Sequence, residues 1–210
     1  MTRPILHDYF RSSAAYRVRI ALNLKSVDHE SRTVNLAEGA QKSDAFRALN
    51  PQGLVPMLEI DGQRLTQSLA IIVYLDQRFP EPSLMPCDPS DGAHVRAMAM
   101  AIACDIHPLN NLRVLKYLQG PLALSEAQKN GWYAHWVNEG LAALEAMAGP
   151  RAGNFLFGGS PSIADVCLVP QLYNARRFDV PLDAFPTLLR ADANANALPA
   201  FADAHPNAVH

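Results

Sequence analysis

The sequence predicts an α/β domain followed by an all-α domain. In the first part of the chain, short apolar runs typical of strands alternate with runs at helical spacing, whereas only helical patterns follow residue 92. Between the two parts lies PEPSLMPCDPSD, whose prolines exclude both a helix and a central strand. We therefore predict a mixed-sheet domain at residues 1–82, a linker at 83–91 and a helical domain at 92–210.

The elements of the first domain are predicted in the order β-α-β-α-β-β-α, which implies a mixed sheet with helices packed on its faces. The segments that form its first half are residues 5–10, 12–25, 32–36 and 43–49. The next stretch, VPMLEIDGQRLTQ, has two short runs around Asp61-Gly62, a dipeptide typical of a two-residue β-hairpin turn. A helix over residues 68–79 completes the domain.

The second domain is predicted to contain helices only. Its helical segments are residues 93–118 with an interruption at Pro108, 125–147, 162–178, 186–192 and 199–204. Two of these helices begin with a capping-box pattern, Ser125 with Gln128 and Ser162 with Asp165. The segment ADVCLVPQL is apolar on nearly all sides, so this helix is expected to be central and buried, with a kink at Pro170.

Composition and charge exclude several classes of function. Of the 210 residues, 49% are hydrophobic and 18% are charged, which is typical of a globular protein. The formal net charge of −2 gives no electrostatic surface for nucleic acid or an anionic membrane. No apolar run is long enough to span a bilayer, and the three cysteines do not form a disulfide framework. We expect a cytoplasmic protein that binds neither nucleic acid nor membrane.

Two hydroxyls and a cation, Arg11-Ser12-Ser13, stand at the start of the first predicted helix. Neither a metal-binding nor a phosphate-binding motif accompanies them. The serines could simply cap the helix, because its first N–H groups have no intrahelical partner. Alternatively, a hydroxyl and the helix dipole could stabilise a bound thiolate, because a helix N-terminus lowers the pKa of a thiol. The residues alone leave both interpretations open.

Two further stretches have features of a binding site for a small acidic peptide. Val55-Pro56 precedes a strand of the hairpin, where a cis peptide would leave the backbone of Val55 available to an extended ligand. Gln67-Ser68 begins the next helix, and its N-terminal N–H groups could hold a carboxylate or be capped by these side chains.

Taken together, these segments resemble the glutathione transferases, and most closely their zeta class. The resemblance rests on SSAAYRVRIAL, NPQGLVPMLEIDG, QSLAIIVYL, DIHPLNN, PSIADVCLVPQ and NARRF, and it covers essentially the whole chain. It implies a thioredoxin-like N-terminal domain that binds glutathione, an all-α C-terminal domain that binds the substrate, and a homodimer.

The resemblance also implies roles for individual residues. Ser12 corresponds to the serine that hydrogen-bonds the glutathione sulfur, and Ser13 to a supporting hydroxyl. The remaining glutathione contacts that it implies are Gln41, Val55, Pro56, Gln67, Ser68, His107 and Asn111. The family's arginines that bind the substrate carboxylates and stabilise the negative charge that develops during the reaction correspond to Arg11, Arg113 and Arg177. Of these, Arg11 and Arg177 are also assigned to catalysis. For His107, a purely structural role beside Pro108 is the alternative; for the arginines, it is a solvated surface position.

The resemblance implies a glutathione-dependent cis–trans isomerase of maleylacetoacetate, a small dicarboxylate of aromatic amino-acid catabolism. Glutathione thiolate adds reversibly to the cis double bond in this family. Maleylpyruvate isomerisation and conjugation of glutathione to small electrophiles or α-haloacids are alternatives, and a non-catalytic binding protein is a further one. The chain differs from animal zeta enzymes because Ala14 and Ala15 stand where those enzymes have cysteine and serine. Any reaction must therefore use the sulfur of glutathione, and this difference could also alter the substrate range.

Overall fold

The computed structural model describes residues 3–209 and divides the chain into two compact units. One unit contains the residues up to Ser83 together with the segment that begins at Ala197, and the other is Leu84–Asn196. The first unit thus includes the end of the chain. This segment was predicted to belong to the helical domain, so the structure differs from the predicted boundary at this point. None of the helices in the described part of the chain is long and apolar enough to cross a membrane.

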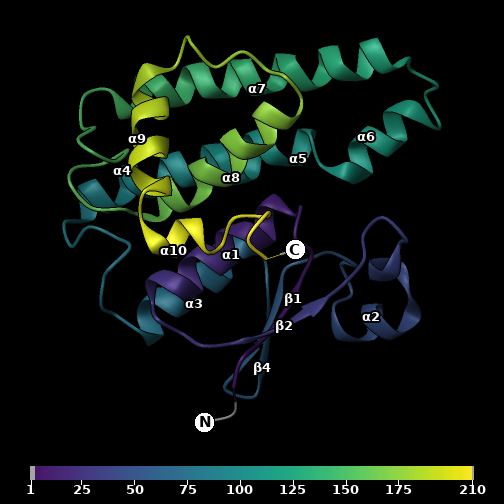
Figure 1. Ribbon diagram of the computed structural model, residues 1–210, viewed down its shortest axis with the longest axis horizontal. Coiled ribbons are helices and arrows are strands. Elements are labelled where there is room, and N and C mark those ends of the chain that lie inside the picture. Colours follow the sequence, from purple (N-terminus) through teal and green to yellow (C-terminus); the bar gives the residue numbers. More distant parts are fainter. Residues whose placement is uncertain (1–2, 210) are drawn as a thin grey trace. The chain divides into compact units, whose positions relative to one another are not determined.

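The first unit is built on a mixed four-stranded sheet, as predicted (Figure 1). Its strands are β1 (Ile5–Asp8), β2 (Glu30–Thr33), β3 (Met57–Ile60) and β4 (Gln63–Thr66), in the order β2-β1-β3-β4. β1 is parallel to β2 and antiparallel to β3, and β3 pairs with β4 in an antiparallel hairpin. The hairpin turns at Asp61 and Gly62, which both have positive φ, as a two-residue turn of this type requires.

Helices cover both faces of this sheet. They are α1 (Ser13–Leu24), α2 (Asp44–Leu49) and α3 (Ser68–Arg78), with a short 3₁₀ turn at Ala40–Lys42 before α2. α1 and α3 pack against each other. Phe46 of α2 contacts His7, whereas the neighbouring residue Leu6 is buried on the opposite face, because successive side chains of a strand alternate.

The end of the chain packs on α1. A short helix, α10 (Pro199–Ala202), lies beside α1 (Figure 1). Asn23 of α1 donates to the carbonyl of Ala200 over 3.0 Å, and the Tyr16 ring contacts His205 edge-on. Phe201 is fully buried. These contacts explain why the last residues belong to the first unit: their apolar side chains complete its core.

The second unit is helical, as predicted. Its helices are α4 (Pro89–Met100), α5 (His107–Leu109), α6 (Leu112–Gln119), α7 (Glu126–Ala148), α8 (Ile163–Arg177) and α9 (Pro186–Asn196), with a π-helical stretch at Ala101–Ile106. α4 begins within the predicted linker, because Asp88 caps it and Pro89 fits its first turn. Both predicted capping boxes are present, and α8 is buried on nearly all sides.

Candidate functional site

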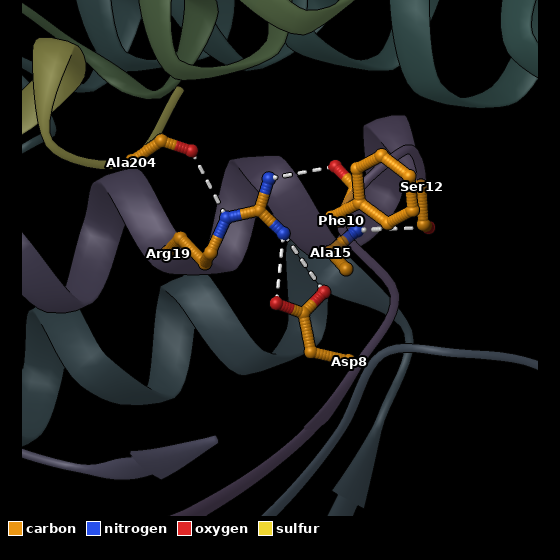
Figure 2. Close-up of polar contacts among 6 residues, drawn as sticks. All are labelled: Asp8, Phe10, Ser12, Ala15, Arg19 and Ala204. Carbon is orange, nitrogen blue, oxygen red and sulfur yellow. Dashed lines mark hydrogen bonds and ion pairs between the residues drawn. The ribbon is translucent and has the colours of Figure 1, made fainter. Parts of the chain in front are cut away.

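Ser12 lies at the N-terminus of α1 and caps it. Its Oγ accepts a hydrogen bond from the backbone N–H of Ala15 at 3.2 Å (Figure 2). A serine hydroxyl has two lone pairs and one proton, so accepting this bond leaves its O–H able to donate to a ligand atom. Ser13 is the first residue of the helix and is buried. Arg11 is exposed, with its guanidinium 5.0 Å from the ring of Phe10.

The turn that carries Ser12 is held by Arg19, a buried residue of the same helix. Its Nη1 donates to both carboxylate oxygens of Asp8 at 2.8 Å, and its Nη2 donates to the carbonyl of Phe10 at 3.1 Å. Its Nε donates to the carbonyl of Ala204 at 3.0 Å, so one guanidinium joins β1, the turn and the end of the chain (Figure 2). Asp8 supplies the negative charge that a buried arginine requires.

The loop between α2 and β3 presents the predicted cis peptide, Val55-Pro56. Asn50 organises the loop: its Nδ2 donates to the carbonyl of Leu54 at 2.7 Å, and its Oδ1 accepts from the N–H of Gln52 at 3.1 Å. Gly53 has φ +60°, and a Cβ there would lie 2.9 Å from the backbone oxygen of Gln41. Only glycine fits this close approach without displacement of the backbone.

Gln41 is buried beside this loop. No described residue donates a hydrogen bond to its buried Oε1. Because burial of an unpaired acceptor is costly, this oxygen is suited to an N–H donor of a ligand.

No side chain in the described part of the chain caps the N-terminus of α3. Its N-cap residue, Gln67, adopts φ 67° and ψ 115°, a strained conformation for a side-chain-bearing residue. The Nε2 of Gln67 donates to Oε1 of Gln52 at 3.1 Å, which links α3 to the loop before the cis peptide. Ser68 is buried and accepts from Nη1 of Arg17 at 3.3 Å. Uncapped N–H groups and a buried cation together favour a carboxylate at this terminus.

The remaining predicted residues lie in the helical unit. His107 begins α5, and Asn111 caps α6 by accepting from the N–H of Arg113 at 3.1 Å. Arg113 is exposed on α6. Arg177 ends α8, where its Nη1 donates to Oδ1 of Asn174 at 3.0 Å.

Contacts therefore join several of the predicted residues within the first unit. A hydrogen bond links Gln67 to the cis-peptide loop and another links Ser68 to α1, and the backbone oxygen of Gln41 lies close to Gly53 of that loop. The sequence patterns did not predict the residues that support them, namely Arg17, Arg19, Asn50, Gln52 and Gly53. The signal for the two arginines was the run RVR inside an otherwise apolar helix, since buried cations there need partners.

Comparisons with known proteins agree with this architecture. The family model for the N-terminal domain of glutathione S-transferase matches residues 6–83, and that for the C-terminal domain matches residues 132–208. The maleylacetoacetate isomerase of Rhizobium meliloti is 48% identical over 204 residues, which cover 97% of this chain and 96% of the relative.

Two solved structures are also similar. A maleylpyruvate isomerase described as a bacterial glutathione transferase of the zeta class has a TM-score of 0.95 and 44% identity, with 97% of each chain covered. A maleylacetoacetate isomerase from Methylobacterium extorquens AM1, solved with malonate and glutathione, has a TM-score of 0.94 and 38% identity, again with 97% of each chain covered. The chain belongs to the glutathione S-transferase family, and within it to the zeta class.

Proposed function

We propose that this protein is a glutathione-dependent isomerase that converts the cis double bond of maleylacetoacetate to the trans form. The observation that carries the proposal is the capping geometry of Ser12, whose hydroxyl accepts the Ala15 N–H and can still donate its proton to a sulfur. The name of the Rhizobium relative and the glutathione and malonate bound to the Methylobacterium relative support it.

The residues of the first unit fit glutathione. The uncapped N-terminus of α3, with Gln67 and Ser68, suits the α-carboxylate of the γ-glutamyl end. The backbone of Val55, before the cis Pro56, suits the extended cysteinyl unit, and the buried Oε1 of Gln41 suits an N–H of the peptide. His107 and Asn111 would supply further contacts from the helical unit.

Bound glutathione supplies a thiolate that adds reversibly to the cis double bond, which allows rotation about the resulting single bond before elimination. Ser12 would keep the sulfur ionised, because its hydroxyl and the N-terminus of α1 both favour negative charge. Ser13 would support this hydroxyl. Because Ala14 lacks a thiol, this stretch of the chain contributes no sulfur of its own.

Three arginines would neutralise the substrate. A maleyl acid carries carboxylates, and additional negative charge develops on its carbonyl oxygen when the thiolate adds. Arg11, Arg113 and Arg177 are the proposed partners, because a guanidinium can bind a carboxylate through two parallel hydrogen bonds. All three are exposed within their own units, so their donors are accessible to a ligand.

Maleylpyruvate is the second candidate substrate. It is favoured by the similarity to the solved maleylpyruvate isomerase, which matches this fold with a TM-score of 0.95. The two substrates share the maleyl group, so the same thiolate and the same arginines would serve both.

Assays of the purified protein with each maleyl acid, with and without glutathione, test the proposal. We expect rapid isomerisation that requires glutathione. The ratio of kcat/KM for the two acids identifies the preferred substrate. If neither acid turns over but glutathione is conjugated to an α-haloacid, the isomerase proposal is wrong. If glutathione does not bind at all, the protein is a non-catalytic member of the family.

We also propose that the protein acts as a homodimer in the cytoplasm. In this proposal the N-terminal domain binds glutathione and the helical domain binds the substrate. The class resemblance supports the dimer, and the exposed free thiols of Cys87 and Cys104 suit a reducing compartment. Sedimentation equilibrium tests the dimer, and cell fractionation tests the location.

A further inference from the structure

Two adjacent arginines end α8, and they have different partners. Nη2 of Arg176 lies 2.7 Å from a carboxylate oxygen of Asp192, a residue of α9 that is only 3% exposed. This ion pair compensates the charge of Arg176 and joins α8 to α9. Arg176 is therefore committed to the structure of the helical unit.

Arg177 is held by a neutral amide instead. Its Nη1 donates to Oδ1 of Asn174, one turn earlier on the same helix, at 3.0 Å. Among the described residues of the helical unit, no carboxylate lies within ion-pair distance of this guanidinium. The amide thus fixes the direction of Arg177 without cancelling its charge, and a carboxylate ligand would meet an uncompensated cation.

The orientation of Asn174 is itself fixed from the core. Its Nδ2 donates to Oη of Tyr133 at 2.8 Å. Tyr133 is fully buried, and its ring stacks on Phe178 with centroids 3.9 Å apart. Because a guanidinium has only donors, the amide oxygen must face Arg177 and the amide nitrogen must face the tyrosine hydroxyl. The rigid stack therefore determines where the guanidinium points.

We propose that Asn174 is a positioning residue that, anchored by Tyr133, holds Arg177 ready to bind a carboxylate of the substrate. This inference rests on the proposed function, in which Arg177 contacts the substrate. It also assigns different tasks to the two neighbours: Arg177 recognises the ligand, and Arg176 joins two helices.

Asn174→Ala tests the proposal through the charge of the ligand. The probes are a maleyl acid, its uncharged analogue dimethyl maleate, and malonate, whose binding in the presence of glutathione is measured by calorimetry. We expect KM for the maleyl acid to rise about tenfold and malonate binding to weaken by a similar factor, as for the loss of one bond to a charged group. The reaction with dimethyl maleate should change less than about twofold.

Two further variants make the result specific. Asn194→Ala is the matched control, because Asn194 likewise uses its amide nitrogen as a donor within this unit, but to the backbone carbonyl of Asn154 and without touching Arg177. This variant should leave KM, malonate binding and the diester reaction unchanged. Asn174→Asp keeps an acceptor of the same size but compensates the charge of Arg177, so it should fold normally and still bind malonate weakly. In an Arg177→Ala background, Asn174→Ala should cause no further loss.

Equal losses with the acid and the diester would overturn the inference, because they would indicate a purely structural role for Asn174. Additive losses in the double variant would overturn it as well. Failure of the proposed function would give a different result. The wild-type protein would then not isomerise maleyl acids, but the affinity for malonate would still show whether Asn174 positions Arg177.

Discussion

The geometry of the Ser12 hydroxyl is compatible with both roles that the sequence presented as alternatives. As a cap, it accepts the N–H of Ala15, and its own proton remains able to donate to a thiolate. Capping even favours the second role, because it fixes the oxygen at the positive end of the helix dipole.

Ser12→Ala removes both contributions, the cap and the hydroxyl donor. We expect the pKa of the bound glutathione thiol to rise by about one to two units, because a hydrogen bond to the charged sulfur is lost. Since less thiolate is then present at neutral pH, turnover should fall about tenfold there and recover as the pH rises. Titration of the thiolate absorbance and the pH profile of kcat/KM measure both effects.

Ser43→Ala is the matched control for this change. Ser43 caps α2 in the same unit and accepts from the N–H of Phe46 at 3.2 Å, the distance found for Ser12. Both variants should lose about 1 kcal/mol of stability as caps. Only Ser12→Ala should alter the thiol pKa, and an equal shift in both would assign the effect to helix stability.

The loop between α2 and β3 depends on one glycine. Gly53 combines positive φ with a close approach to the carbonyl of Gln41, whereas Gly62 in the hairpin turn has positive φ but open space around it. The two positions thus share the backbone requirement and differ only in what a side chain would meet.

Gly53→Ala should therefore weaken glutathione binding more than the unfavourable positive φ of the new alanine would by itself. Gly62→Ala serves as the comparison and should cost about 1–2 kcal/mol of stability, as for a non-glycine residue in the left-handed region. Gly53→Ala should cost more and raise the Kd of glutathione about tenfold, because the displaced loop carries Val55 and adjoins Gln41. Equal affinities in the two variants would show that the loop position is irrelevant to binding.

A hydrogen bond between side chains of β1 and β3 gives the stability of the first unit a pH dependence. Nε2 of His7 lies 2.7 Å from Oε1 of Glu59, and this hydrogen bond holds the pKa of Glu59 below its ordinary value of 4.5. Because the folded state has the lower pKa, the carboxylate stabilises the fold above the unfolded pKa, and this contribution is lost as the pH falls through the folded one.

Melting temperatures of the wild type and Glu59→Gln should thus differ most near about pH 6, and they should converge as the pH falls through the lowered pKa of Glu59. Glu38→Gln, which changes an exposed acid, is the control and should follow the wild type. A difference that stayed constant over this range would exclude the His7–Glu59 pair as its cause.

The end of the chain forms part of the unit that carries Ser12. Arg19 binds the carbonyls of Phe10, in the turn before Ser12, and of Ala204, near the end of the chain. These two carbonyls are far apart in the sequence, but one guanidinium connects them (Figure 2). The C-terminal segment therefore supports the turn that precedes Ser12.

A chain that ends after Asn196 should lose most of its glutathione affinity, at least about tenfold, because Arg19 loses an acceptor and the buried surface around Phe201 is exposed. A chain that ends after Pro206 keeps these contacts and should bind normally. Both tryptophans, Trp132 and Trp136, lie in the helical unit, so their fluorescence reports separately on that unit. Identical glutathione binding by the two truncated proteins would contradict the supporting role.

Much of the fold followed from local sequence patterns. The Asp61-Gly62 turn, the capping boxes at Ser125 and Ser162 and the buried helix α8 are encoded by residues within a few positions of one another, so periodicity and turn chemistry were sufficient to predict them. The cis Val55-Pro56 peptide was predicted in the same way, from a proline at the start of a strand.

The tertiary structure alone decided which distant residues meet. Arg19 and Ala204 are 185 positions apart, and Asn174 and Tyr133 are 41 apart, so no local period relates them. Local sequence patterns likewise could not distinguish Arg176 from Arg177, and only the family resemblance pointed to Arg177, because the two neighbours carry the same charge and differ only in their partners. That choice depends on packing, which brings the carboxylate of Asp192 to one arginine and leaves the other beside a neutral amide.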